Sequence, residues 1–351
     1  MVAAGRLRQN HFLSWRRWVT AVICLQTLSF LGAREVPPSS FTSAAAALNS
    51  IQVPGGTADN SLTGDIVYIE LRSDTAQLAD KDFSFLCQLI YTQSRIRLGP
   101  DKRTLVSSRL AKRLRQLQLS GYHEYCELLR SPAGEEELRF LIDRISTNHT
   151  YFFREMKHFD FLREKVLPQW QARSQVKKEM FRVWSAACSS GEEPYSLAIH
   201  LAEHLAPAGP NTWRIEASDI STRVLEIAER GVYDGEKLEG ISQELLRRHF
   251  QKGVREWLGH YRIKDELRQR VGFHQLNLLE ANYPFGRPFD VIFCRNVMIY
   301  FDRPTQESLI EYLAERLVPG GYLMVGHSES LSGIKHSLRL VQPAIYLKPV
   351  G

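Results

Sequence analysis

Two carboxylates follow a run of small residues near the middle of the chain, where Gly191-Glu192-Glu193-Pro194 comes after residues 185–190. Small residues let a ligand approach the backbone closely, and Pro194 suits the first turn of a helix. The glycine pattern of a dinucleotide site is missing, and two acids would repel a pyrophosphate. The acids suit a ligand with a cationic part, or they only complement the positive end of a helix.

Polar residues also end two other hydrophobic segments. Asp219 follows residues 213–218 and could accept the hydroxyls of a ribose, although it could equally cap the next helix. Arg295 and Asn296 come directly after residues 289–294, and Tyr300 lies four residues later. We expect these groups at one edge of a sheet, with Tyr300 on the rim of a crevice.

A fourth polar segment, residues 146–155, lies before all of these. Asn148 and Thr150 precede an aromatic cluster, which Arg154 follows. From composition alone, the aromatic residues would belong to a core and Arg154 to the surface.

The elements that must position these residues follow an alternating pattern from residue 181 onward. Strand-length apolar runs alternate with helical stretches, which predicts an α/β fold with a doubly wound, mostly parallel sheet. The predicted strands are residues 181–187, 213–218, 289–294, 321–326 and 344–347. The predicted helices are residues 194–206, 221–230 and 304–317. Residues 261–264 and 271–276 interrupt this rhythm, and we interpret them as short strands of an inserted β subdomain at about 249–275.

The preceding region is helical. Apolar residues between 81 and 167 recur at spacings of three to five without strand-like alternation, which predicts a small domain of about four helices. The chain then divides into an extension or linker (1–80), a helical domain (81–167) and the sheet domain (178–351).

The cysteine spacing and the charge distribution argue against several classes of protein. Five scattered cysteines without a C-x-x-C pair argue against a zinc site and a disulfide framework, and fit a reducing cytoplasm. The net charge is +6, but most of it lies in residues 1–35, so a nucleic-acid-binding protein is not indicated. One basic stretch, residues 95–115, stands out.

Residues 1–35 resemble a weak signal sequence, with a basic flank before an apolar stretch. Polar residues interrupt that stretch, and it is shorter than the ~20 residues that a spanning helix needs. We favour a disordered extension, or residues translated from an upstream start codon, followed by a flexible linker.

The motifs in this order resemble the CheR-type chemotaxis receptor methyltransferases. The strings G-E-E-P-Y-S and F-C-R-N-V-M-I-Y-F carry the resemblance, with residues 146–155, 217–220, 277–280 and Gly326-His327-Ser328-Glu329. It extends over about residues 81–349. It implies an all-helical domain, a Rossmann-like methyltransferase domain with a small inserted antiparallel β subdomain, and S-adenosylmethionine as the cofactor, without a metal.

The resemblance also implies roles for individual residues. Asp219 would bind the ribose, Glu193 would lie near the cationic amino-acid end, and Asn277 and Leu278 would flank the adenine. The implied cofactor contacts are Asn148, Thr150, Arg154, Glu193, Asp219, Asn277, Leu278, Arg295 and Asn296. Arg154 and Tyr300 are the candidate catalytic residues, and their division of labour stays open.

The implied substrate is a glutamate side chain of a chemotaxis receptor, methylated as part of sensory adaptation. Because a glutamate carboxyl has a pKa near ~4.3, it is already a nucleophilic carboxylate. Arg109, Lys112 and Arg113 share one helix face, and we expect them to meet an acidic receptor helix. We further expect a cytoplasmic monomer that reaches the membrane only through receptors and does not bind nucleic acid.

Three other classes remain as alternatives. A degenerate methyltransferase fold could sense the cofactor without turnover, but Arg154 and Tyr300 are intact. A nucleotide-dependent oxidoreductase of Rossmann type would need the missing glycine pattern, and Glu192 and Glu193 also argue against it. A small-molecule or nucleic-acid methyltransferase would leave the helical domain unexplained.

Overall fold

The computed structural model describes residues 77–146, 148–177, 179–205, 212–280 and 283–350. All of them belong to one compact unit of the chain, Arg72–Gly351. The predicted extension and its apolar stretch fall on residues 1–76, outside the described ranges. No helix in the described ranges is long and apolar enough to cross a membrane.

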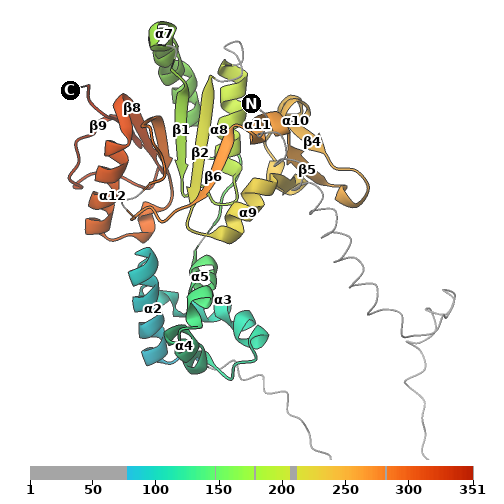
Figure 1. The fold of residues 1–351 in the computed structure, drawn as a ribbon, viewed down its shortest axis with the longest axis vertical. Helices are drawn as coiled ribbons and strands as arrows, with labels where there is room; N and C mark the ends of the chain where they lie inside the picture. Colours follow the sequence, from blue (N-terminus) through green and yellow to red (C-terminus); the bar gives the residue numbers. More distant parts are fainter. Residues whose placement is uncertain (1–76, 147, 178, 206–211, 281–282, 351) are drawn as a thin grey trace, which may run out of the picture. The chain divides into compact units, whose positions relative to one another are not determined.

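Four helices form the first described layer and confirm the predicted all-helical domain. They are α2 (Asp80–Ser94), α3 (Arg103–Gln116), α4 (Tyr122–Arg130) and α5 (Gly134–Ile145) (Figure 1). The spacing of Val106, Leu110 and Leu114 on α3 puts them on one face, and all three are buried. These helices have a hydrophobic core of their own, which extends from Leu78 to Ile145.

A seven-stranded sheet follows, with the order β6-β2-β1-β7-β8-β10-β9. Its strands are β1 (Phe181–Ala186), β2 (Trp213–Asp219), β6 (Val271–Gln275), β7 (Phe289–Cys294), β8 (Leu317–Val325), β9 (Arg339–Gln342) and β10 (Ile345–Leu347). The first five in spatial order pair in parallel, and β10 and β9 add an antiparallel edge. The sheet thus confirms the predicted α/β class.

Helices cover both faces of this sheet, as a parallel sheet requires. On one face, Phe181 and Val183 of β1 join a core with α6 (Lys157–Phe161), α7 (Leu167–Lys177) and α8 (Glu192–Leu205). On the other, Trp184 and Ala186 join a core with α12 (Arg303–Glu315). A π-helical turn, η2 (Leu162–Val166), connects α6 to α7.

The end of the helical domain differs from the prediction. Residues from Phe152 onward, including Phe159, Leu162 and Trp170, pack into the core of the sheet rather than that of helices α2–α5. The helical pattern therefore continues past Ile145 into helices that cover the sheet. Periodicity detects a helix but does not identify its packing partner.

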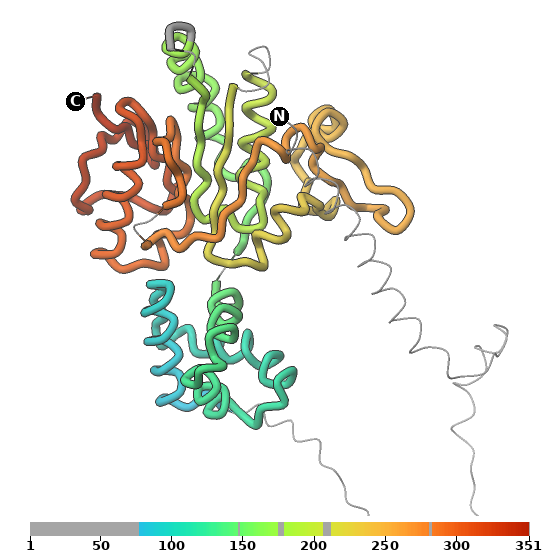
Figure 2. Tube along the Cα trace, in the orientation of Figure 1, coloured from blue at the N-terminus to red at the C-terminus, as the bar shows by residue number. Residues whose placement is uncertain are grey.

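The inserted subdomain also differs from the prediction. A separate antiparallel sheet contains β3 (Val232–Asp234), β5 (His260–Ile263) and β4 (Phe250–Lys252), in that order. Helices α9 (Thr222–Arg230), α10 (Gln243–His249) and α11 (Asp265–Arg268) flank it in the chain. The predicted strand 271–276 is instead β6, the edge of the large sheet beside β2, and Figure 2 follows the chain from the insert back to it. The sequence of a short strand does not show which of two sheets it will join, because that depends on the strand with which it pairs.

Candidate functional site

The candidate site is a pocket at the carboxyl ends of β1, β2 and β7. The order of the strands reverses between β1 and β7, and ligands of doubly wound sheets bind outside such a switch point. Residues from the end of α2, the start of α3 and the segment 145–154 complete its wall. The pocket therefore receives side chains from both described layers.

The loop after β1 has a backbone shaped to approach a ligand. Ala187, Ser189 and Gly191 have left-handed φ values of 62°, 51° and 96°, which cost most residues energy and are common at functional sites. A Cβ on Gly191 would meet the Tyr233 hydroxyl at 2.7 Å. Glycine is therefore required here by both conformation and space.

Asp219 ties this loop to the end of β2. Its carboxylate accepts the backbone N–H groups of Ser189 (2.8 Å) and Ser221 (3.0 Å). Burial raises the pKa of Asp219, while these two hydrogen bonds act in the opposite direction. Asp219 lines the pocket and has oxygen lone pairs left for a ligand hydroxyl.

The two adjacent acids have different surroundings. Glu192 is fully buried and accepts from Lys237 Nζ and Ser190 Oγ, both at 2.6 Å. Glu193 lines the pocket, and its Oε1 accepts from Ser185 Oγ at 2.6 Å. Only one carboxylate of the predicted pair is thus available to a cationic ligand, which a string of sequence letters cannot show.

Arg295 connects three segments beneath the pocket. Its guanidinium lies 3.1 Å from Glu193 Oε2 and 3.1 Å from Glu155 Oε2, and it donates to the Arg154 carbonyl over 2.6 Å. Burial raises the pKa of Glu193, and Arg295 limits that rise. Arg295 therefore joins Glu193 and Glu155 and, with Arg154 nearby, offsets part of the negative charge of Glu193.

The segment before the sheet contributes an unpartnered donor. Asn148 Nδ2 is buried without a hydrogen-bond partner among the described residues, and the Asn148 carbonyl accepts from Ser189 Oγ at 3.2 Å. A buried donor of this kind is costly unless a ligand satisfies it. Arg154 donates to the His149 carbonyl and lies over the Tyr151 ring, so it stays near the mouth.

The opposite wall suits a flat apolar group. Leu278 is buried, and both Leu278 and Ile220 line the pocket. Asn277 is held by the backbone, because its amide donates to the Gln93 carbonyl (3.1 Å) and its oxygen accepts from Leu279 N (3.2 Å). Such apolar and amide groups suit a flat heteroaromatic ring.

All ten residues predicted for catalysis or cofactor binding line this one pocket: Asn148, Thr150, Arg154, Glu193, Asp219, Asn277, Leu278, Arg295, Asn296 and Tyr300. Sequence reasoning missed its contribution from the helical layer, which includes Ile96, Arg97, Leu98 and Lys102. The basic stretch 95–115 signalled two of these, but only folding brings them to the pocket.

The three predicted recognition residues lie outside the pocket lining. Arg109 donates to the carbonyls of Arg144, Ile145 and Ser146 at the end of α5. Arg113 forms three hydrogen bonds of 3.0, 3.1 and 2.5 Å to Glu137. Two of the three cations thus hold α3 against α5, while Lys112 is exposed and has no ion pair among the described residues.

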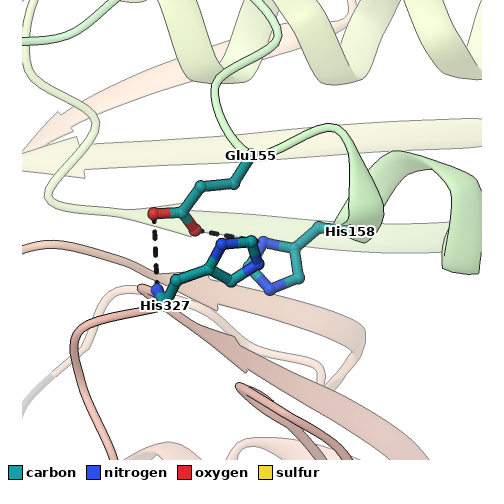
Figure 3. Close-up of side chains that lie close together, drawn as sticks. All are labelled: Glu155, His158 and His327. Atoms are coloured by element: carbon teal, nitrogen blue, oxygen red, sulfur yellow. Dashed lines mark hydrogen bonds and ion pairs between the residues drawn. The ribbon is translucent and has the colours of Figure 1, made fainter.

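Glu155, His158 and His327 are close enough to hold a metal ion (Figure 3). The His158 Nδ1 lies 3.5 Å from Glu155 Oε2, and the backbone N–H of His327 donates to Glu155 Oε1 at 3.3 Å. The same Glu155 carboxylate is paired with Arg295. A metal ion would have to displace this guanidinium or lie beside its positive charge, so the arrangement is unfavourable for a cation.

Comparison with known families assigns both layers. Residues 148–347 match the CheR methyltransferase, SAM binding domain, and residues 81–146 match the CheR methyltransferase, all-alpha domain. This chain belongs to the CheR methyltransferase family. Its sheet domain is the S-adenosylmethionine-binding domain of that family, and the buried Asn148 donor, the acids Glu193 and Asp219, and the apolar wall fit this cofactor.

Several chemotaxis methyltransferases resemble this CheR chain over most of their length. A chemotaxis protein methyltransferase of Salmonella typhimurium is 42% identical over 77% of this chain and 90% of its own. Chemotaxis protein methyltransferase 2 of Pseudomonas aeruginosa is 43% identical over 76% of this chain and 92% of its own. A chemotaxis protein methyltransferase of Borreliella burgdorferi is 39% identical over 76% of this chain and 94% of its own. The chain is therefore similar to these chemotaxis protein methyltransferases over both of its matched domains.

Proposed function

We propose that this protein methylates glutamate side chains of chemotaxis receptors, giving glutamate methyl esters and S-adenosylhomocysteine. One observation carries the proposal: the pocket has acids at its cofactor end and cations at its mouth. Asp219 and Glu193 line its sheet side, where Arg295 offsets only part of their charge, whereas the exposed Arg97 and Lys102 line the side formed by the helical layer. This polarity suits a cationic cofactor and an anionic acceptor.

The acceptor needs little activation. A glutamate carboxyl is ionised at neutral pH, so no general base has to remove a proton. S-adenosylmethionine, when bound, supplies an electrophilic methyl group. The protein would then contribute alignment of the acceptor oxygen and exclusion of water.

Arg154 and Tyr300 are the residues that we assign to the acceptor. Arg154 is held near the mouth by the His149 carbonyl at 3.1 Å, where its guanidinium could receive a carboxylate. Tyr300 is fixed through its backbone, because the Arg97 N–H donates to the Tyr300 carbonyl at 3.0 Å. Its phenol could orient the acceptor oxygen, as a hydroxyl both donates and accepts.

Glu193 and Asp219 would hold the two ends of the cofactor. The partly buried Glu193 carboxylate suits the ammonium group, and Asp219 suits the ribose hydroxyls. Thr150, Arg295 and Asn296 would complete the amino-acid end, while Asn277 and Leu278 would flank the adenine. Each of these residues has side-chain or backbone atoms on the pocket wall.

Receptor recognition would use surfaces outside the pocket. Arg109, Lys112 and Arg113 lie on α3, and Lys112 is the cation most available to an acidic helix. The small sheet β3-β5-β4 offers a second surface, because β4 is an edge strand among the described residues, to which an extended receptor tail could add. We place the protein in the cytoplasm as a monomer that meets the membrane only through receptors.

The test is transfer of labelled methyl groups. Purified protein would be incubated with labelled S-adenosylmethionine and membranes that contain a chemotaxis receptor, and the products treated with alkali. We expect volatile labelled methanol, because methyl esters hydrolyse under these conditions whereas N-methyl groups do not. A receptor whose acceptor glutamates are replaced by alanine is the matched control.

Two results would contradict the proposal. Alkali-stable label would indicate transfer to nitrogen, and thus a different acceptor class. Cofactor binding without any transfer to receptors would instead favour the sensing alternative, in which the fold binds S-adenosylmethionine but does not turn it over.

A further inference from the structure

The last motif shared with the family, Gly326-His327-Ser328-Glu329, ends in a buried carboxylate outside the pocket wall. Glu329 is 6% exposed. Its Oε2 accepts the backbone N–H groups of Asn296 (2.6 Å) and Gly326 (2.7 Å), and its Oε1 accepts that of Ile299 (3.3 Å). One side chain therefore fastens two different segments to each other.

No Lys, Arg or His forms an ion pair with Glu329 in the described part of the chain. Backbone N–H groups from two separate segments are the hydrogen-bond donors to this carboxylate. Burial raises the pKa of Glu329, and the hydrogen bonds from Asn296, Gly326 and Ile299 oppose that rise. Burying a carboxylate without a cation costs free energy. The hydrogen bonds to the backbone must offset this cost.

The segment that Glu329 holds has an unusual backbone. Asn296 has a left-handed φ of 59°, a conformation that asparagine tolerates better than most other residues. Gly326 allows the close approach, because a Cβ there would lie 2.6 Å from Glu329 Oε2 and 2.5 Å from Asn296 Nδ2. The carboxylate, the glycine and the bent backbone thus form one fitted unit.

This segment carries two residues of the pocket. Asn296 and Tyr300 lie on either side of Ile299 in the chain, and both line the pocket, whereas Glu329 does not. The short helix η6 (Met298–Tyr300) leads directly to Tyr300. A change in the hydrogen bonds to Glu329 would therefore be transmitted to both side chains.

We infer that Glu329 is a positioning residue that fixes the segment Asn296–Tyr300, and thereby sets the alignment of the cofactor and the acceptor. The inference rests on the proposed function for its acceptor side only. The part of the inference that concerns the cofactor involves Asn296 and requires only that the protein binds S-adenosylmethionine. The two parts can be measured separately.

The test compares Glu329→Gln with Asp290→Asn. Glutamine keeps the size of Glu329 but turns an NH₂ group toward backbone donors, so at least one hydrogen bond is lost. Asp290 is the control, because it is a buried carboxylate on β7, the strand that leads to Asn296. It accepts from Arg182 N at 2.9 Å and pairs with Arg173, away from the pocket lining. We expect both variants to fold with a lowered Tm.

Only the first variant should change function. We expect Glu329→Gln to lower kcat about tenfold or more and to weaken S-adenosylhomocysteine binding at least about threefold, as measured by calorimetry. Asp290→Asn should change neither by more than about twofold at a similar loss of Tm. Equal effects of the two variants, or unchanged kinetics and binding in Glu329→Gln, would overturn the inference.

A second comparison tests the route through Tyr300. In a Tyr300→Phe background, Glu329→Gln should lower kcat less than it does in the unmodified protein, because the group it positions is already missing. The same loss in both backgrounds would refute that route. If the unmodified protein methylates no receptor carboxylate, the proposed function fails, while the S-adenosylhomocysteine comparison still decides whether Glu329 positions Asn296.

Discussion

The backbone N–H of Ser189 donates to the Asp219 carboxylate over 2.8 Å, which joins the loop after β1 to the end of β2. The second carboxylate oxygen accepts from Ser221 N at 3.0 Å. Asp219 therefore shapes the wall of the pocket as well as facing its interior. Because Asp219 both holds the loop and faces the pocket, a test of its role in binding needs a variant that preserves its shape.

Replacing Asp219 should weaken cofactor binding. Hydrogen bonds between a ribose and a carboxylate contribute about 1.5–3 kcal/mol each, so Asp219→Ala should lower the affinity for S-adenosylhomocysteine by at least about tenfold. Asp219→Asn keeps the shape and should have a smaller effect. Calorimetry measures both, and unchanged affinity in the alanine variant would remove Asp219 from the binding site.

Tyr300→Phe should slow methyl transfer with little change in cofactor affinity. Loss of one hydroxyl that orients the acceptor should cost about 1 kcal/mol in the transition state, or several-fold in kcat. Tyr312→Phe is the matched control, because Tyr312 packs beside the core on the α12 side of the sheet and does not line the pocket. A purely lower affinity in Tyr300→Phe would instead assign its hydroxyl to the cofactor.

The three cations of α3 should separate into two groups. Lys112→Glu should raise the KM for receptor and flatten its salt dependence, because an exposed charge acts over a Debye length of ~8 Å. Arg113→Glu should mainly lower Tm, since Arg113 pairs with the buried Glu137. Arg109→Glu should do the same, because it would place a carboxylate against the carbonyls at the end of α5.

The control for this series is Lys335→Glu, the same charge change at an exposed position in the sheet domain. Its KM for receptor should match that of the unmodified protein. If Lys112→Glu behaves like Lys335→Glu, α3 presents an ordinary solvated face, and the small sheet β3-β5-β4 becomes the better candidate for receptor recognition.

His158 should make stability depend on pH. Burial, together with nearby Arg295, lowers the pKa of His158 to about 3, whereas an unfolded histidine has a pKa of about 6.5. As the pH falls below 6.5, the His158 ring is therefore protonated in the unfolded chain but stays neutral in the folded protein. The stabilising contribution of the neutral ring is complete above that pH and is lost progressively toward pH 3.

His158→Phe removes this titration. Between pH 7.5 and pH 5 the unmodified protein should lose roughly 2 kcal/mol relative to the variant, as measured by urea unfolding at each pH. His200, whose pKa burial also lowers to about 3, is present in both proteins, so its effect cancels. Parallel stability curves would show that the His158 ring is protonated in the folded state.

The sequence by itself indicated most elements of the fold and a set of polar residues that the structure brings to one pocket, but not the contribution of the helical layer, such as Arg97 and Lys102. The alternation of apolar strands and helices predicted the sheet, because each such strand must be buried on both faces. Asp219 and Arg295 could be placed at one edge because each follows a parallel strand. The family resemblance added Asn148, Thr150 and Arg154, which composition alone would have assigned to the core or surface.

Only the tertiary structure decided which partner each residue meets. Glu192 and Glu193 are neighbours in the chain, yet one is neutralised by Lys237 and the other faces the pocket. Arg109 shares a helix face with Lys112 but ends on the carbonyls of α5. Strand β6 was predicted to belong to the insert, but it pairs in parallel with β2 and so belongs to the large sheet. Periodicity and residue type report local geometry, whereas pairing and charge compensation depend on segments that meet only when the chain folds.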